Sequence, residues 1–132
     1  MITLKDWLSS YEQLPTVQIV NAHTVEGVCK DVQGDRAQYA KVTLRFSPAS
    51  KMAFGHSIGG KKPSVAETVL WQRSVYLGVL DVMLAHAPTP ITGFRCEIEE
   101  MDFHMVDSSN DAFRLAGRQA ALEFLKSEAA QP

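Results

Sequence analysis

Residues 102–117 read DFHMVDSSNDAFRLAG, and the interpretation of the whole sequence starts from this stretch. It combines a strand end, a turn with one histidine, two serines and the start of a helix. Ser108 or Ser109 is the expected N-cap, because a serine oxygen can accept a hydrogen bond from a free amide of the first helical turn. The helix is expected to run to about Lys126. Small side chains that would let it lie close against a sheet recur along it: Ala112, Ala116, Gly117 and Ala120.

The spacing of apolar residues predicts the strands and the helix that precede residue 102. Short β-branched or alternating segments predict strands over 15–22, 24–31, 38–46 and 91–101. A turn-rich loop at 33–37 would join the second and third strands into a long hairpin. The loop at 47–63 has room for one short strand at 52–54. A capping box at Ser64 opens a helix that is expected to end near Ala87. The expected class is therefore α+β.

Residues 1–14 have the apolar spacing of an amphipathic helix that Pro15 ends. The stripe is formed by Leu4, Trp7, Leu8 and Tyr11. It either packs on the rest of the chain or docks a partner, which includes a second copy in a homo-oligomer. Residues 15–132 would form the domain itself.

Bulk composition describes one soluble globular domain. The chain has 132 residues, 45% of them hydrophobic and 21% charged, and a formal net charge of −2. A protein that coats nucleic acid through bulk electrostatics would normally be basic, so any nucleic-acid contact has to be local. No apolar run predicts a membrane span, and the first residues do not resemble a secretory signal. The expected location is cytoplasmic, with Cys29 and Cys96 as reduced core thiols.

Gly55–Gly59 matches the G-x-S-x-G nucleophile elbow, which would make Ser57 a hydrolase nucleophile. That chemistry needs a helix starting at the serine, whereas the capping box places the helix start several residues later. Gly55–Lys61 also approaches a phosphate-binding loop, but Lys62 stands where a magnesium-binding Ser or Thr is needed. Asp31–Gly34 reads D-x-x-G, a pattern too short to carry weight. Nucleotide hydrolysis by this chain is not expected, and a serine hydrolase is the least favoured hypothesis.

The four histidines do not have metal-ligand spacing. His23, His56, His86 and His104 form no H-E-x-x-H pair, and no C-x-x-C is present. The neighbouring His104, Asp107 and Ser108 resemble a triad, but neighbours in sequence rarely have triad geometry. We therefore expect no catalytic residue, no metal and no cofactor, and we classify the chain as a non-enzyme.

Two segments together carry a resemblance to a known family. Residues 34–42, GDRAQYAKV, resemble the G-G-R-G-Q-Y-G-x-V loop and strand of domain IV of elongation factor G, the translocase. Residues 104–117 resemble the H-x-V-D-S-S-x-x-A-F-x-x-A-G segment of the same domain. Pro15 and Val17, and Ile58–Gly60, also stand where that family has similar residues. The resemblance covers about residues 15–124, and its second motif is highly specific.

The resemblance implies a ribosomal protein S5 domain 2-like fold. Helices would pack on one face of a four-stranded sheet, with a left-handed β-α-β crossover, which is a rare exception to the right-handed rule. In the translocase the two motif loops meet at a domain tip that enters the ribosomal decoding centre. Transferred by position and extended by the nearby lysine, the tip residues are Lys30, Gly34, Asp35, Arg36, Gln38, His104 and Val106.

Departures from the family pattern bear on this tip. Asp35, Ala37 and Ala40 replace glycines, and Met105 stands where the translocase usually has aspartate. Asp35 adds negative charge where phosphates would approach, and the alanines restrict the backbone. The leading hypothesis is a non-catalytic module that binds the ribosome or another structured RNA. The alternative is a protein–protein interaction module that keeps the fold without binding RNA.

Overall fold

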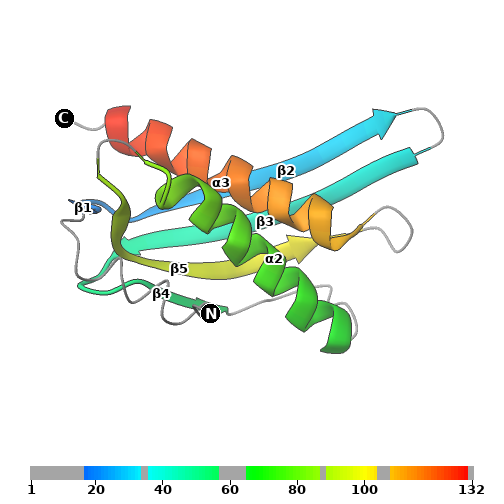
Figure 1. The fold of residues 1–132 in the computed structure, drawn as a ribbon, viewed down its shortest axis with the longest axis horizontal. Helices are drawn as coiled ribbons and strands as arrows, with labels where there is room; N and C mark the ends of the chain where they lie inside the picture. Colours follow the sequence, from blue (N-terminus) through cyan, green and yellow to red (C-terminus); the bar gives the residue numbers. More distant parts are fainter. Residues whose placement is uncertain (1–16, 34–35, 57–64, 87–88, 104–107, 131–132) are drawn as a thin grey trace, which may run out of the picture.

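Alternating apolar side chains turn one face of a mixed β-sheet toward two helices (Figure 1). The computed structural model describes residues 17–33, 36–56, 65–86, 89–103 and 108–130. In chain order the described elements are β1 (Val17–Gln18), β2 (His23–Gln33), β3 (Arg36–Pro48), β4 (Ala53–His56), α2 (Val65–Met83), β5 (Ile91–Asp102) and α3 (Asn110–Ala130). The predicted helix at 1–14 and the Ser64 cap lie outside the described residues.

β5 is the central strand of the sheet. β3 lies antiparallel along one of its edges, and β2 lies antiparallel on the far side of β3. β1 and β4 both run parallel to β5 along its other edge, β1 beside Ile91 and β4 beside Arg95 to Ile98. The sheet has five strands in all, and four of them, β4, β5, β3 and β2, lie side by side over Cys96–Ile98 of β5.

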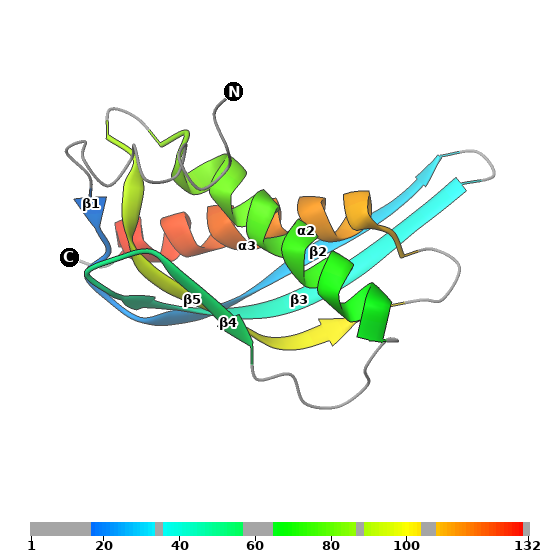
Figure 2. The same cartoon turned by 60° about the horizontal axis from the view of Figure 1, so that its bottom comes forward.

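The connection from β4 through α2 to β5 joins two neighbouring parallel strands. With the helices toward the viewer and the strands pointing up, β5 lies to the left of β4, so the crossover is left-handed (Figure 1, Figure 2). This confirms the expected α+β class and the S5 domain 2-like topology, with α2 and α3 on the same face of the sheet.

The core lies between that face and the two helices. Strand residues facing the helices are fully buried and alternate with polar residues on the open face. α3 contributes phenylalanines and alanines to the same core. The largest buried side chains include Val42, Leu44, Phe46, Phe94, Ile98, Phe113 and Phe124. Cys29 and Cys96 are both buried in the core, as expected, and burial raises the pKa of Cys96.

α3 lies against the sheet at glycine and alanine positions. A Cβ on Gly27 of β2 would fall 1.9 Å from the Ala116 carbonyl oxygen, and one on Gly117 would fall 2.3 Å from the Val75 carbonyl oxygen of α2. Real Cβ atoms do not approach so closely, so both contacts require glycine. Ala116 and Ala120 thus pack against the sheet at Gly27, as expected, whereas Gly117 packs against α2 and not against the sheet.

The first predicted strand is too long. Within the described residues β1 comprises Val17 and Gln18, and residues 19–22 of the predicted strand lie outside it. One further hydrogen bond joins the Ile19 amide to the Gly93 carbonyl, and the chain then leaves the sheet edge. The amides of Val20 and Asn21 donate instead to the Glu128 carboxylate of α3. The β-branched residues of this segment do not indicate that its amides will donate hydrogen bonds to a helix far away in the sequence.

The hairpin between β2 and β3 is tighter than predicted. Gln33 pairs with Arg36, so only residues 34–35 separate the strands in place of a loop over 33–37. The optional strand predicted at 52–54 is present as β4 at Ala53–His56. The helix predicted to end near Ala87 ends at Met83.

Candidate nucleic-acid interface

The predicted tip residues belong to the hairpin end of the sheet and to the segment after β5. The paired ends of β2 and β3 project beyond the ends of β5 and α3 (Figure 1). The Arg36 backbone lies at this projecting end, where β3 begins. The Arg36 side chain and all of Gly34, Asp35, His104 and Val106 lie outside the described residues.

Lys30 and Gln38 lie on opposite faces of the hairpin. Lys30 is exposed on the face turned away from the helices, where it pairs across strands with Tyr39. Gln38 is half-buried and faces the helix side, where its Oε1 accepts a hydrogen bond from the buried Cys29 thiol at 3.9 Å. A single flat RNA surface could contact Lys30 but not Gln38 at the same time.

Tyr39 connects the two segments that carried the family resemblance. Its hydroxyl donates a hydrogen bond of 2.5 Å to Oδ2 of Asp102, at the end of β5. Its backbone carbonyl accepts a hydrogen bond of 2.7 Å from the Ser108 hydroxyl, just before α3. The site predicted from sequence contains none of these three residues, although Tyr39 and Ser108 stand within the two motifs. Motif membership was the signal that could have identified them.

The hydrogen bond to Asp102 keeps the Tyr39 phenol protonated. That bond raises the pKa of Tyr39 to about 12, helped by partial burial and by repulsion between a tyrosinate and the carboxylate. Tyr39 is therefore a neutral hydrogen-bond donor across the physiological range, and Asp102 is the acceptor. The pair joins the first part of β3 to the end of β5.

Ser109, not Ser108, is the N-cap of α3. Its Oγ accepts a hydrogen bond from the Ala112 amide at 3.1 Å, and its carbonyl accepts one from the Phe113 amide at 3.1 Å. Ser108 uses its hydroxyl to hold Tyr39 instead. The sequence alone could not tell which serine caps the helix. In the structure Ser109 caps α3 and Ser108 binds the Tyr39 carbonyl.

An aromatic cluster supports the segment after β5. Trp71 of α2 stacks on Phe113 of α3 at a centroid distance of 4.8 Å and contacts Phe103 at 5.4 Å. All three side chains are buried. Phe103 is therefore fixed between both helices directly before residues 104–107, which places the root of the second motif on a rigid base.

The open face of the sheet carries charges of both signs along its length. On the open face of the sheet, exposed Lys30 and Arg45 alternate with exposed Glu26, Glu100 and Asp102. This distribution offers local cationic contacts without a continuous positive field.

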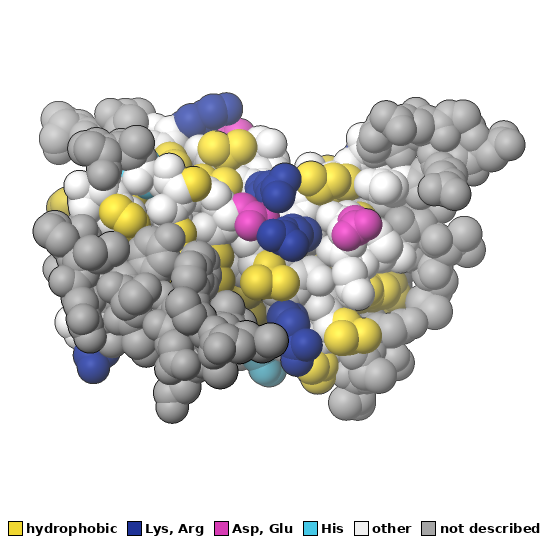
Figure 3. Space-filling model, viewed as in Figure 1, with side chains coloured by type: hydrophobic (Ala, Val, Ile, Leu, Met, Phe, Trp, Pro, Cys, Tyr) yellow, Lys and Arg dark blue, Asp and Glu magenta, His cyan; other side chains and the backbone are white. Residues whose placement is uncertain are grey.

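The helix-covered face is also mixed in charge. Asp81 accepts hydrogen bonds from both Arg114 and Arg118 between α2 and α3. In Figure 3 basic and acidic side chains lie side by side over the helices, among apolar ones. Among the described residues of this face, basic side chains are therefore interspersed with acidic ones and form no continuous basic patch.

The other candidate sites gain no support from the described geometry. Gly55 lies within β4, α2 begins only at Val65, and Ser57 lies outside the described residues. His23 lies 3.3 Å from the Glu128 carboxylate, and Nδ1 of His86 lies 3.0 Å from the Thr89 carbonyl oxygen. Within the described residues, no three His, Cys, Asp or Glu side chains gather as metal ligands would.

No helix in the described part of the chain is both long enough and apolar enough to cross a bilayer.

Comparison with known proteins agrees with the observed fold. The family model described as elongation factor G, domain IV, matches residues 15–128. Among solved structures, 59 chains match, including a crystal structure of a protein from Thermus thermophilus at 27% identity and a TM-score of 0.71. That match covers 80% of this chain but only 16% of the Thermus protein. No curated protein sequence matches the chain significantly.

Proposed function

The chain belongs to the elongation factor G domain IV family, and from that membership we propose that it is a non-catalytic module that binds ribosomal or other structured RNA. The family is that of a domain of a translation factor. The contact surface would be the hairpin end of β2 and β3 together with the segment that follows β5. The same two segments carry the sequence resemblance.

The observation that carries the proposal is the connection through Tyr39. Hydrogen bonds from Tyr39 to Asp102 and from Ser108 to Tyr39 hold the roots of the two motif segments together. A recognition surface made of two loops needs such a fixed base, because ordering loops at the moment of binding costs affinity. The buried Trp71–Phe103 contact supports the second root in the same way.

Cationic and neutral polar side chains would contact different parts of the RNA. Lys30 and Arg36 would meet phosphates, and Gln38 and His104 would offer hydrogen bonds to bases or 2′-hydroxyls. Because Gln38 faces the helix side and Lys30 the open side, RNA would have to enclose the hairpin end and not lie across one face. Asp35 and the net charge of −2 make the binding dependent on a few cations.

Co-sedimentation with purified ribosomes at low and moderate salt tests the proposal. The chain should pellet with ribosomes at low salt and less so at moderate salt, since phosphate contacts release counterions. Lys30→Glu and Arg36→Glu should each reduce pelleting. Lys51→Glu is the matched control, because Lys51 is exposed beyond the opposite end of β3. Failure to pellet at low salt, or equal effects of all three variants, would contradict the proposal.

Tyr39→Phe separates positioning from contact. The variant lacks the hydroxyl that reaches Asp102 but keeps the ring and every cationic side chain. It should weaken pelleting without changing the salt dependence, because the number of phosphate contacts is unchanged. If the Tyr39→Phe chain pelleted like the wild type, the hydrogen bond from Tyr39 to Asp102 would no longer support the proposal.

A further inference from the structure

β2 forms a long free edge on the side of the sheet away from β5. It is the outermost strand, and its far edge pairs with no strand in the described part of the chain. The strand has 11 residues, and its pairing with β3 runs from His23 to Gln33 without a bulge. Natural proteins usually shorten, bend or cover such an edge, because its unpaired amides and carbonyls can bind another strand.

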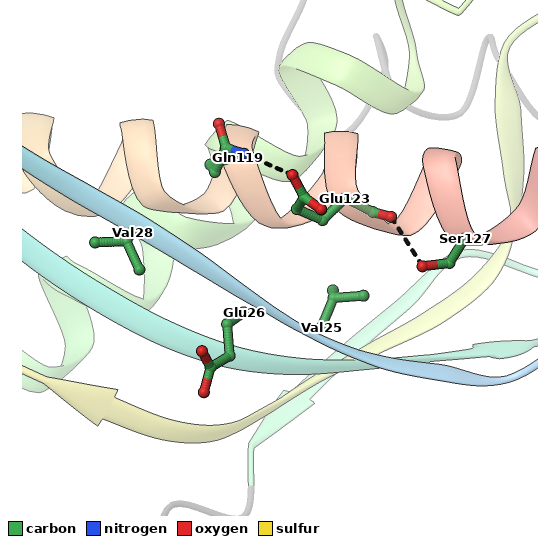
Figure 4. Close-up of a pocket in the computed structure, with 6 residues that line it drawn as sticks. All are labelled: Val25, Glu26, Val28, Gln119, Glu123 and Ser127. Atoms are coloured by element: carbon green, nitrogen blue, oxygen red, sulfur yellow. Dashed lines mark hydrogen bonds between the residues drawn. The ribbon is translucent and has the colours of Figure 1, made fainter.

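A groove follows this edge where α3 passes alongside β2. Its volume is about 510 Å³. Figure 4 shows its lining on the two flanking elements, and α3 presents residues spaced four apart as one ridge. The lining residues are Val25, Glu26, Val28, Gln119, Glu123 and Ser127.

The ridge on α3 is held in place by its own hydrogen bonds. Gln119 Nε2 donates to the Glu123 carboxylate at 2.9 Å, and the Ser127 hydroxyl donates to the Glu123 carbonyl at 3.1 Å. A polar wall fixed in this way can face a guest strand without first reorganising. That lowers the entropic cost of binding there.

The acidic residues that line the groove favour a basic ligand. Its two ionisable lining residues, Glu26 and Glu123, are both acidic. Lys41 and Lys126 each approach only Oε1 of one of these carboxylates, at 3.7 and 3.3 Å. Val25 and Val28 contribute aliphatic side chains to the lining, and Val28 is 41% exposed. Two carboxylates disfavour a phosphate backbone at this place.

We infer that β2 accepts an extended segment of a partner polypeptide as an additional strand, with its lysine or arginine side chains meeting Glu26 and Glu123 and its aliphatic side chains meeting Val25 and Val28. Main-chain hydrogen bonds to the free edge would supply affinity, and alternate side chains would supply specificity. This surface lies on β2 and α3. It borders Lys30, one of the proposed RNA contacts, but its lining includes none of the residues proposed to bind RNA.

A synthetic peptide provides the probe. The probe is an end-blocked octapeptide that repeats Lys-Lys-Val-Val, titrated into the ¹⁵N-labelled chain. Because side chains alternate faces along a strand, this repeat places both lysine and valine on each face of the bound peptide. The amide shifts should be confined to residues 24–30 and 119–127, and β2 amides should become protected from hydrogen exchange. Methylation of alternate peptide nitrogens removes the strand-forming donors, so it should weaken binding at least about tenfold.

Charge reversal tests the specificity. Glu26→Lys combined with Glu123→Lys should weaken binding of the lysine peptide at least about tenfold and create binding of a glutamate–valine peptide. Glu100→Lys is the matched control, since Glu100 is an exposed glutamate on β5 outside the groove. If the double variant does not fold, Glu26→Lys alone gives the same test, because the Glu26 side chain is 59% exposed.

Four results would overturn the inference. The first three are no shifts on β2 at millimolar peptide, equal binding of the lysine and glutamate peptides by the wild type, and loss of binding in Glu100→Lys. Concentration-dependent broadening of β2 amides without peptide would assign the edge to a second copy of this chain, which also overturns it. Ribosome pelleting is a separate readout, so failure here leaves the proposed function untouched.

Discussion

The Tyr39 hydroxyl lies 2.5 Å from the Asp102 carboxylate although the two residues are 63 positions apart in the sequence. Each stands at the root of one of the two segments that resemble the translocase domain. Together with the Ser108–Tyr39 hydrogen bond, this contact turns two separate motifs into one end of the molecule.

Replacing Asp102 with asparagine should lower the pKa of Tyr39. That pKa is raised from 10.0 to about 12, mainly by the hydrogen bond to Asp102, and asparagine carries no charge to oppose a tyrosinate. Ultraviolet titration of tyrosinate should show one tyrosine moving toward its ordinary pKa, and Tyr39→Phe identifies which. Tyr76, whose pKa burial also raises to about 12, should stay unchanged.

The same pair makes stability depend on alkaline pH. Because the folded pKa of Tyr39 exceeds the unfolded one, its contribution is complete below pH 10.0 and is lost as pH rises toward about 12. Asp102→Asn should therefore lose less stability across that interval than the wild type. Identical losses in urea melts of the two proteins would show that Asp102 does not control Tyr39.

Gly27→Ala should destabilise the fold by about 1–3 kcal/mol or more, the usual cost of forcing atoms into a packed core. The new Cβ would meet the backbone of α3 at Ala116 and Ala120, which cannot move aside cheaply. Gly55→Ala is the control, because its new Cβ would meet only the end of the flexible Arg95 side chain. Thermal melts that rank the two variants equally would contradict the close approach of α3 to β2.

Asp81→Asn should lower stability at neutral pH by about 1 kcal/mol or less, the range for partly exposed ion pairs. Hydrogen bonds from Arg114, then from Arg118, hold the pKa of Asp81 below its ordinary value of 3.8. A lowered folded pKa gives stability that is present above pH 3.8 and lost as pH falls further. The variant should thus lose less stability on acidification, with Glu100→Gln as the control in melts across that range.

Ser109→Ala should cost about 0.5–2 kcal/mol, because it removes the N-cap of α3. Ser109→Asp should restore stability, since aspartate caps equally well. Ser108→Ala should instead weaken the contact with Tyr39 and leave the helix start intact. Amide hydrogen exchange at Ala112 distinguishes the two, and faster exchange in Ser108→Ala would reverse the roles of the two serines.

Local patterns predicted most of the elements because their signals are local. The alternation over 38–46 and 91–101 identified β3 and β5, and the apolar face after Ser64 identified α2. The alternation fails after Ile98. There the register with β3 shifts so that Thr43 pairs with Glu100, Glu99 is the extra residue, and Met101 turns to the core. A bulge of this kind depends on the partner strand, which one strand's sequence does not specify.

By itself, the sequence determined the α+β class, the positions of the long elements and, through two motifs, the family. These depend on periodicity and on residue types at fixed spacings, which are properties of one segment at a time. Tertiary structure alone decided which motif residues work together. It placed Tyr39 against Asp102 and Ser108, put Lys30 and Gln38 on opposite faces, and left the edge of β2 open beside α3. Each of these relations joins residues through sheet register or helix docking, where a shift of one residue reverses the face a side chain occupies.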